Sequence, residues 1–253
     1  MNNNLDRRAF LKLLAASGCA SFLGAARSFG DPALKTGTQG PVCPWARLHH
    51  RCVNGDDDDW NVHPHGDLNL IDHITTHTTV NLDRNWNIAK LDKLDEMVRY
   101  PFLFMHSELA PDFTSENRAN LREYFLRGGF LFAEDCVNGK GRTGGHSNTD
   151  YFFLRMATEL PAILPEAKFE KVPFDHPVFH SFFHIYGGLP HMQGIPHGLY
   201  GATYNGRLVA LLSPSDTHCA WTGWFSEAKR RAGLQMGTNI YVYAMTQPTP
   251  GGF

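Results

Sequence analysis

The sequence has no internal repeat, no low-complexity tract and no apolar run long enough for a comfortable membrane span. These absences exclude a disordered protein, a collagen-like repeat and a multi-span membrane protein. Cysteine is scarce, with 5 residues in a chain of 253, and neither a CxxC pair nor a CxxCH sequence occurs. The lack of both patterns argues against a zinc ribbon and a c-type haem.

What remains is an ordinary globular composition with one departure. Hydrophobic residues make up 42% and charged residues 19% of the chain, and a single α/β domain is routinely of this length. The departure is a set of 14 histidines, all between His49 and His218, so none belongs to a terminal tag. No shift in composition marks a boundary, and we therefore expect one domain over residues 45–253 after a lead-in over 31–44.

The first thirty residues are typical of a targeting segment rather than of a folded element. Arg7-Arg8 is followed by Phe10-Leu11-Lys12 and a weakly apolar stretch, which resembles a twin-arginine export signal. The alternative is an amphipathic N-terminal helix with two chance arginines. We expect residues 1–30 to be removed and the mature protein to be periplasmic or secreted, or lipid-anchored if Cys19 is acylated.

Removal of that segment changes the charge balance. It contains four of the 23 basic residues and one of the 25 acidic residues, so the mature chain carries a net charge of −5 with histidine neutral. Such a chain has no electrostatic reason to bind nucleic acid or an anionic bilayer, and we expect no transmembrane span in it. Because twin-arginine export carries folded proteins, a divalent metal such as zinc or iron could be loaded before export. After export, Cys43 and Cys52 could form a disulfide.

Strand-like and helix-like patterns alternate along the chain. Continuous apolar runs over 100–105 and 130–133 are typical of strands buried on both faces, and a helical pattern over 115–127 separates them. Asn205-Gly206 between two apolar runs predicts a hairpin over 199–213. We expect further strands over 45–52 and 79–82, and helices over 66–78, 91–98, 149–160 (ended by Pro161) and 233–246. This order predicts an α/β fold with a mainly parallel sheet.

Polar residues follow three of the predicted strands. In open parallel sheets, ligands bind outside the carboxyl ends of the strands, so these residues would converge if the strands are neighbours. The candidate catalytic residues are His106, Asp135, Cys136, Asp216 and His218, and the candidate ligand-binding residues are Ser107, Glu134, Ser213 and Ser215.

Cys136 is the candidate nucleophile. A cysteine just after a buried strand can become a reactive thiolate if a helix N-terminus and a histidine lower its pKa. Its neighbours oppose that role, because only Gly139 fits the small residues of a nucleophile elbow, and Glu134 and Asp135 would raise the pKa of the thiol. A buried structural cysteine is the alternative.

Several histidines repeat at spacings that suit a metal. His176, His180 and His184 would line one face of a helix, and they are the candidate metal ligands. In an extended segment, residues four apart lie about 13 Å from each other, which is too far to share one ion. Two further histidine pairs, His63 with His65 and His73 with His77, could bind a metal, and the acidic turn 56–59 could bind calcium. For each of these groups, a solvated surface role is the alternative.

Four segments together carry a family resemblance: 100–105, 127–136, 175–182 and 213–216. They resemble a bacterial family known only as a domain of unknown function. That family is similar to the class I glutamine amidotransferase-like group and to trehalose-utilisation-type proteins. The resemblance implies a flavodoxin-like three-layer α/β/α fold with a C-terminal β-hairpin and no established activity. The Gly-x-Cys-x-Gly pattern of glutaminases is absent.

Two functions follow from these observations. The first is an exported, non-glutaminase binding or accessory protein for a small polar ligand, a metal or a protein partner. The alternative is an exported hydrolase that acts on a carbohydrate or an amide, with or without a metal. In that enzyme, Asp135 and Asp216 would be the acid–base groups, with His106 or His218 beside them.

Overall fold

The protein folds around one seven-stranded sheet in the order β2-β1-β3-β4-β7-β6-β5. The structure is a computed structural model, and it describes residues 41–137 and 150–247. The elements in chain order are β1 Ala46–His49, α2 His65–His77, β2 Asn87–Lys90, α3 Leu94–Met97, β3 Phe102–Ser107, α4 Ser115–Leu126, β4 Phe130–Asp135, α5 Tyr151–Ile163, β5 Lys168–Lys171, the 3-10 helix η1 Pro177–Phe179, β6 Tyr200–Tyr204, β7 Arg207–Ser213, α6 Thr217–Trp221 and α7 Glu227–Thr246.

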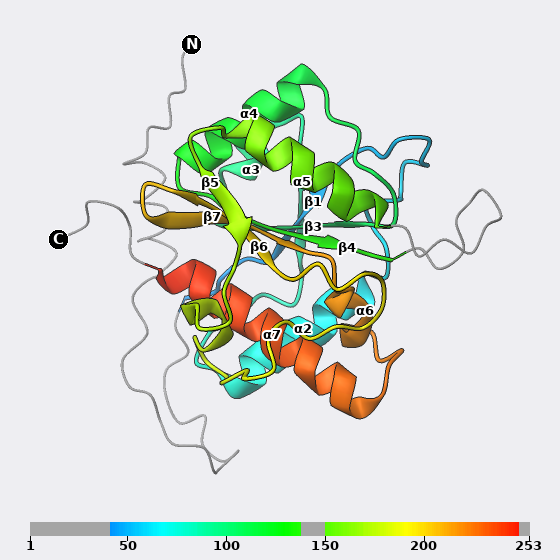
Figure 1. Ribbon diagram of the computed structural model, residues 1–253, viewed down its shortest axis with the longest axis vertical. Coiled ribbons are helices and arrows are strands. Elements are labelled where there is room, and N and C mark those ends of the chain that lie inside the picture. The colour runs from blue at the N-terminus through cyan, green and yellow to red at the C-terminus, as the bar shows by residue number, and fades with distance from the viewer. Residues whose placement is uncertain (1–40, 138–149, 248–253) are drawn as a thin grey trace.

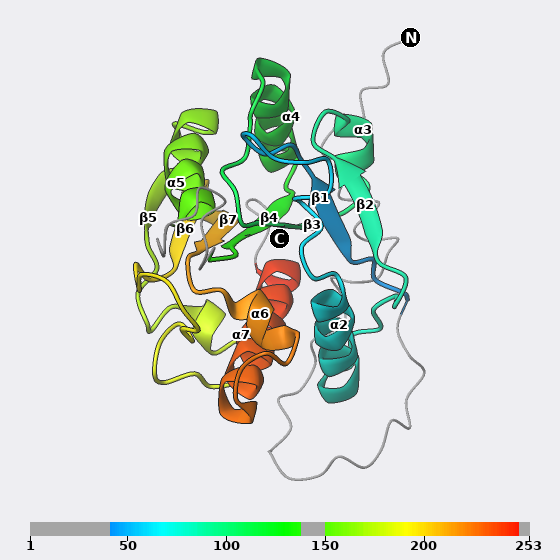
Figure 2. The ribbon, with the colours of Figure 1, turned by 90° about the vertical axis from the view of Figure 1, so that its right-hand side faces the viewer.

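The sheet is parallel through five strands and antiparallel at one edge. β2, β1, β3, β4 and β7 pair in parallel, in the order found in flavodoxin-like sheets. β6 and β5 then add to β7 in antiparallel pairs. Helices α3, α4 and α5 cover one face of the sheet, and α2, α6 and α7 cover the other (Figure 1 and Figure 2). The predicted α/β fold with a mainly parallel sheet and a C-terminal hairpin is confirmed.

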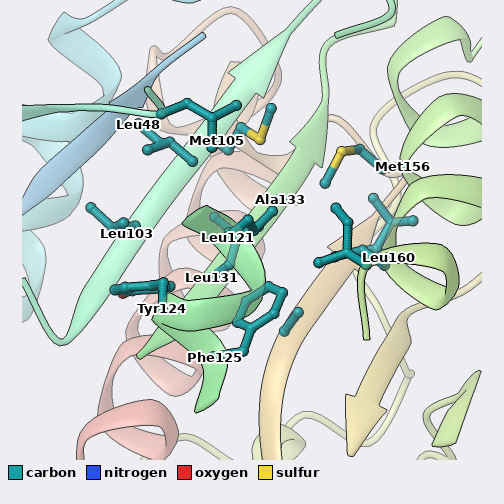
Figure 3. Packing of buried hydrophobic residues seen from close by; sticks show 14 of the residues in the cluster. Leu48, Leu103, Met105, Leu121, Tyr124, Phe125, Leu131, Ala133, Met156 and Leu160 are labelled. Carbon is teal, nitrogen blue, oxygen red and sulfur yellow. The ribbon is translucent and has the colours of Figure 1, made fainter. Parts of the chain in front are cut away.

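The two faces of the sheet carry separate hydrophobic cores because side chains alternate along each strand. On the α4–α5 face, strand residues such as Leu103 and Leu131 pack against Leu121 of α4 and Leu160 of α5 (Figure 3). On the other face, Phe104 and its strand neighbours pack against α2, α6 and α7. Every residue of β3 and β4 is buried, as the continuous apolar runs predict.

The hairpin prediction is confirmed by the pairing of β6 and β7. Asn205 and Gly206 form its turn with φ angles of 49° and 74°, which asparagine and glycine adopt more readily than other residues. The closing helix is also present, but it begins earlier than predicted. Ser226 provides its N-cap by accepting the Lys229 N–H, so α7 starts at Glu227 rather than at residue 233.

Two predictions of local structure are wrong, and two strands were not predicted. Segment 79–82 forms no strand, and Leu82 makes only an isolated bridge to Cys43. Pro161 does not end α5, which continues to Ile163; near a helix end, a missing N–H costs a single hydrogen bond. β2 and β5 were not predicted, because each has only four residues and neither is an apolar run.

Several predictions lie outside the described residues. These are the export signal over 1–30, the acylation of Cys19, the first part of the lead-in over 31–44 and the loop that contains Gly139. Among the helices that the structure describes, none has the length and hydropathy needed to cross a membrane.

A test of the fold concerns the turn between α4 and β4. A Cβ atom on Gly129 would overlap the ring of Tyr124, whose hydroxyl lies 3.0 Å from the carbonyl oxygens of Tyr100 and Phe130. The ring cannot shift without losing these bonds, so Gly129→Ala should lower the free energy of unfolding by about 1–3 kcal/mol in a denaturant titration. The matched control is Gly187→Ala, because a Cβ there meets no described atom within 4 Å. Equal stabilities for the two variants would contradict this packing.

Candidate functional site

The carboxyl ends of β3, β4 and β7 lie side by side, as the sequence predicts. In the register of the sheet, His106 pairs with Glu134 and Ser107 with Asp135. Glu134 in turn pairs with Ser213 on β7. The candidate residues therefore converge on one edge of the sheet, and all of them are buried.

The alternation of side chains divides these residues between the two faces of the sheet. His106 and Glu134 lie on the face covered by α6, where the ring of His106 stacks on Phe104. Asp135 lies on the opposite face, where it accepts the N–H of Phe153 in α5 at 3.0 Å. The sheet thus separates Asp135 from His106, so this imidazole does not lie beside the Asp135 carboxylate as the predicted hydrolase would require.

Glu134 binds the first turn of α6. Its carboxylate accepts the N–H groups of Thr217 and His218, each at 2.9 Å, and also the hydroxyls of Ser213 and Thr217. Burial raises the pKa of Glu134, and the hydrogen bonds from Thr217 oppose that effect. Four donors around one buried carboxylate indicate a structural tie between β4 and α6 rather than a ligand contact.

The predicted ligand-binding serines have structural contacts as well. Ser107 Oγ lies 3.1 Å from the thiol of Cys52 and accepts the N–H of Leu109. Ser213 donates to Glu134, and the carbonyl of Ser215 accepts the N–H of Met192. These contacts fix the loops around the sheet edge.

A buried ion pair joins β1 to α2 on the face of the sheet that α2 and α6 cover. The sequence patterns did not reveal it. Arg47 of β1 donates to Asp67 of α2 through two nitrogens, at 2.6 and 2.8 Å, and His218 Nε2 lies 3.1 Å from the same carboxylate. Burial alone would raise the pKa of Asp67, but the Arg47 guanidinium holds that pKa well below its ordinary value. A Cβ on Gly66 would lie 2.8 Å from His218 Nε2, so glycine is required for this approach.

His106 and His218 stand together within this network, with ring centroids 4.2 Å apart. His106 Nδ1 donates to the carbonyl of Glu134, and burial lowers the pKa of both imidazoles. Among the described residues, His106 Nε2 and His218 Nδ1 have no hydrogen-bond partner. Both histidines are therefore neutral, tightly packed groups.

Three buried carboxylates surround the end of β4. Asp135, Asp150 and Asp216 each have one oxygen without a hydrogen-bond partner among the described residues. Burial raises the pKa of Asp135, and the charges of Asp150, Asp216 and Glu134 raise it further. Burial also raises the pKa of Asp216, to which the amide of Gln193 donates. Asp150 is paired with His197 at 2.8 Å.

Two thiols adjoin Asp216. Cys136, directly after β4, lies 3.7 Å from Cys219 of α6, measured between the sulfur atoms. The two sulfurs and an oxygen of Asp216 all lie within 4.8 Å of one another, and the three side chains are buried. Their shared hydrogen bond raises the pKa of Cys136 and lowers that of Cys219.

These surroundings do not suit Cys136 as a nucleophile. A raised pKa keeps the thiol protonated, and its hydrogen-bond partner is a second thiol rather than a histidine. The residue with a left-handed backbone conformation at this end of the sheet is Asp216, whose φ is 54° in the turn from β7 to α6. Strained backbone of this kind concentrates at functional turns.

The predicted histidine ligands are spread out. Segment 176–184 contains a 3-10 turn, η1, and no α-helix, because Pro177 follows His176 in an extended conformation. His180 and His184 have ring centroids 5.8 Å apart, whereas the ring of His176 packs on Tyr243. Among the described residues, only Cys136, Asp216 and Cys219 are grouped at the spacing of metal ligands.

The other predicted clusters also have local partners. His73 and His77 stack with centroids 4.1 Å apart and bond to Thr238 and to the helix backbone. The rings of His63 and His65 are 6.2 Å apart. In the acidic turn, Asp59 accepts the N–H of Asp56.

The predicted Cys43–Cys52 disulfide is wrong. Cys52 is a thiol in contact with Ser107, on the sheet edge. Cys43 lies before β1, where its backbone forms an isolated β-bridge with Leu82. β1 lies between the two residues, with Cys43 before its first residue and Cys52 after its last.

Comparison with known proteins confirms one part of the family resemblance, the similarity to a domain of unknown function. The model of a family described as a domain of unknown function, DUF4159, matches residues 45–245. The chain belongs to the DUF4159 family. Among curated proteins, none matches it. The description of the family carries no activity, so the function of this DUF4159 domain has to be argued from its site.

Sequence patterns placed Cys219 among the polar residues after the predicted hairpin, but they gave it no role in the DUF4159 site and missed other residues entirely. Cys219 is one of five residues of a short helix and is 83 positions from Cys136, so only the fold brings the two together. The one available signal was the Asp-x-x-Cys spacing of Asp216 and Cys219, because residues three apart share a helix face. The other missed residues are Arg47, His50, Asp67, Asp150 and Gln193.

A pH measurement tests the electrostatics of this edge. Burial lowers the pKa of His50 to about 4, and its Nδ1 donates to the carbonyl of Leu48. Since the unfolded chain binds the proton first, stability should fall by about 1.4 kcal/mol per pH unit for this histidine as pH drops from 6.5 to 4. His50→Asn should remove that part of the slope in unfolding titrations. The exposed control, His77→Asn, should keep the slope, and an unchanged slope in His50→Asn would contradict the assignment.

Proposed function

We propose that this DUF4159 domain is an exported, non-glutaminase binding protein that takes up a cation at the carboxyl edge of its sheet. The cation is either a metal ion or the positively charged group of a small polar ligand. The twin-arginine pattern at Arg7-Arg8 supports export to the periplasm or medium, with acylation of Cys19 as the lipid-anchored alternative.

One observation carries the proposal. Asp135, Asp150 and Asp216 are buried, and each has a carboxylate oxygen without a donor among the described residues. The donors that lower the pKa of Asp135 and Asp216 are the Phe153 N–H and the Gln193 amide, and neither carries a charge. Buried carboxylates are costly unless a cation or strong donors compensate them, so their retention here favours a cationic ligand.

The contrast with Asp67 supports a binding role for these carboxylates. Asp67 is equally buried, but Arg47 and His218 satisfy it, and the pair closes the fold. The same chain therefore neutralises Asp67 internally, whereas Asp135 and Asp216 have no charged donor among the described residues and Asp150 is paired with His197. A role as a binding protein also agrees with the protonated thiol of Cys136, which does not favour a thiol hydrolase.

A substitution at Asp135 tests the proposal. In the chelator-treated protein at pH 7.5, Asp135→Asn should raise the free energy of unfolding by about 1–2 kcal/mol, because it removes an uncompensated buried charge. For a domain of this size, the melting temperature should rise by about 2–8 °C. The reference variant is Asp67→Asn, which breaks a satisfied buried ion pair and should cost about 3–5 kcal/mol.

The same experiment has a contradicting outcome. A lower melting temperature for Asp135→Asn would mean that its carboxylate is already satisfied as a structural group. The exposed control Asp72→Asn, which lies in a surface pair with Arg84, should change the melting temperature little.

A further inference from the structure

We propose that Cys136, Asp216 and Cys219 form a binding site for a thiophilic divalent cation, with Zn²⁺ as the model ion. The inference rests on the proposed function, because it names the class of cation that the sheet edge takes up. None of the three residues belongs to the histidine series that the sequence suggested as ligands.

The separation of the two sulfurs fits a zinc ion. With Zn–S bonds of about 2.3 Å and tetrahedral angles, two zinc-bound thiolates lie about 3.8 Å apart. The Cys136 and Cys219 sulfurs are 3.7 Å apart in the structure. A zinc-bound carboxylate oxygen would lie about 3.5 Å from each sulfur, and the Asp216 oxygen lies within 4.8 Å of both. Little movement separates the present arrangement from a coordinating one.

The fold fixes the directions from which the three ligands approach. Cys136 leaves the end of β4, which pairs in parallel with β7. Asp216 is the N-cap of α6 and Cys219 follows three residues later, so the two share one side of the first helical turn. The tie between Glu134 and Thr217 anchors that turn to β4. The ligands therefore come from two elements whose relative position is set independently of any ion.

A second observation points to a ligand at this place. The Asp216 side chain is fully buried, Oδ1 accepts no N–H or O–H donor among the described residues, and the Cys219 thiol lies beside this carboxylate. Its other oxygen accepts from the Gln193 amide, which also lies 3.4 Å from the carbonyl of Val137. Orientation of one carboxylate oxygen by an outer donor while the other faces the ion is the usual arrangement around protein metal sites.

The chemistry of the donors selects a soft or borderline cation. Thiolates favour zinc and similar ions, whereas magnesium and calcium require oxygen ligands. A divalent cation would replace the thiol protons and neutralise much of the negative charge that two thiolates and one carboxylate bring. Three protein ligands leave one position of a tetrahedral ion for water or an exogenous donor, as in zinc sites that bind or transform ligands.

Cobalt titration of the full chain tests the site, with Co²⁺ as a spectroscopic substitute for zinc. The protein is purified without a metal column, reduced, and freed of metal by a chelator. We expect one Co²⁺ per chain with the near-ultraviolet absorption of thiolate-to-cobalt charge transfer, displaced by Zn²⁺. Cys136→Ser and Cys219→Ser should each abolish that absorption and weaken cobalt binding more than 100-fold. Loss of a residue that only supports a metal ligand weakens binding by about 10–100-fold, so a larger effect indicates a direct ligand.

Matched variants separate this site from other metal-binding groups. Cys52→Ser removes another buried thiol of the same edge, and the pair His180→Ala with His184→Ala removes surface imidazoles; all should keep the absorption. Circular dichroism and melting curves of the metal-free variants report whether each one folds. Cobalt bound without the charge-transfer absorption, or with an absorption that survives Cys136→Ser in a folded chain, would overturn the proposal.

The outcome also separates the two proposals. If Mg²⁺, Ca²⁺ or a small amine stabilises the chain through Asp135 while cobalt gives no thiolate absorption, the cation-binding function stands and the thiophilic site is wrong. If no cation stabilises the chain, both are wrong. If the two cysteines instead form a disulfide that persists under reductant and blocks cobalt, the pair is a structural disulfide and this inference fails.

Discussion

The hydrogen bonds between Glu134 and the first turn of α6 are the constraint on which the sheet edge depends. They join the end of β4 to the backbone of Thr217 and His218, two residues that lie more than eighty positions later in the chain. Because the tie also includes Ser213 at the end of β7, it fixes the turn in which Asp216 adopts its left-handed conformation. The positions of Cys219, Asp216 and His218 all follow from it.

Buried carboxylates at this edge have two different kinds of surroundings. On the α2–α6 face, Arg47 neutralises Asp67, and two neutral histidines pack against the pair. At the end of β4, the negative groups have few donors, and those on Asp135 and Asp216 are uncharged. The first arrangement stabilises the fold, whereas the second costs stability unless a cation arrives. Both regions are equally buried, and this difference is the reason why we place the proposed cation site at the end of β4.

The apolar runs of β3 and β4 and the Asn205-Gly206 turn were sufficient to predict the α/β fold and the convergence of strand ends. Alternation along strands could have placed His106 and Asp135 on opposite faces, because they sit at paired strand ends one residue out of phase. The contact between Cys136 and Cys219 could not be predicted, since it depends on the tertiary tie through Glu134. The histidine spacing was misleading, because Pro177 and its neighbours form a 3-10 turn rather than a helix.

X-ray absorption of the chain with one equivalent of Zn²⁺ tests the central claim most directly, because it reports the atoms bound to the ion. The account predicts a first shell with two sulfur atoms at about 2.3 Å and oxygen or nitrogen at about 2.0–2.2 Å. A shell of nitrogen and oxygen alone would place the ion on histidines or carboxylates and contradict a site formed by Cys136, Asp216 and Cys219.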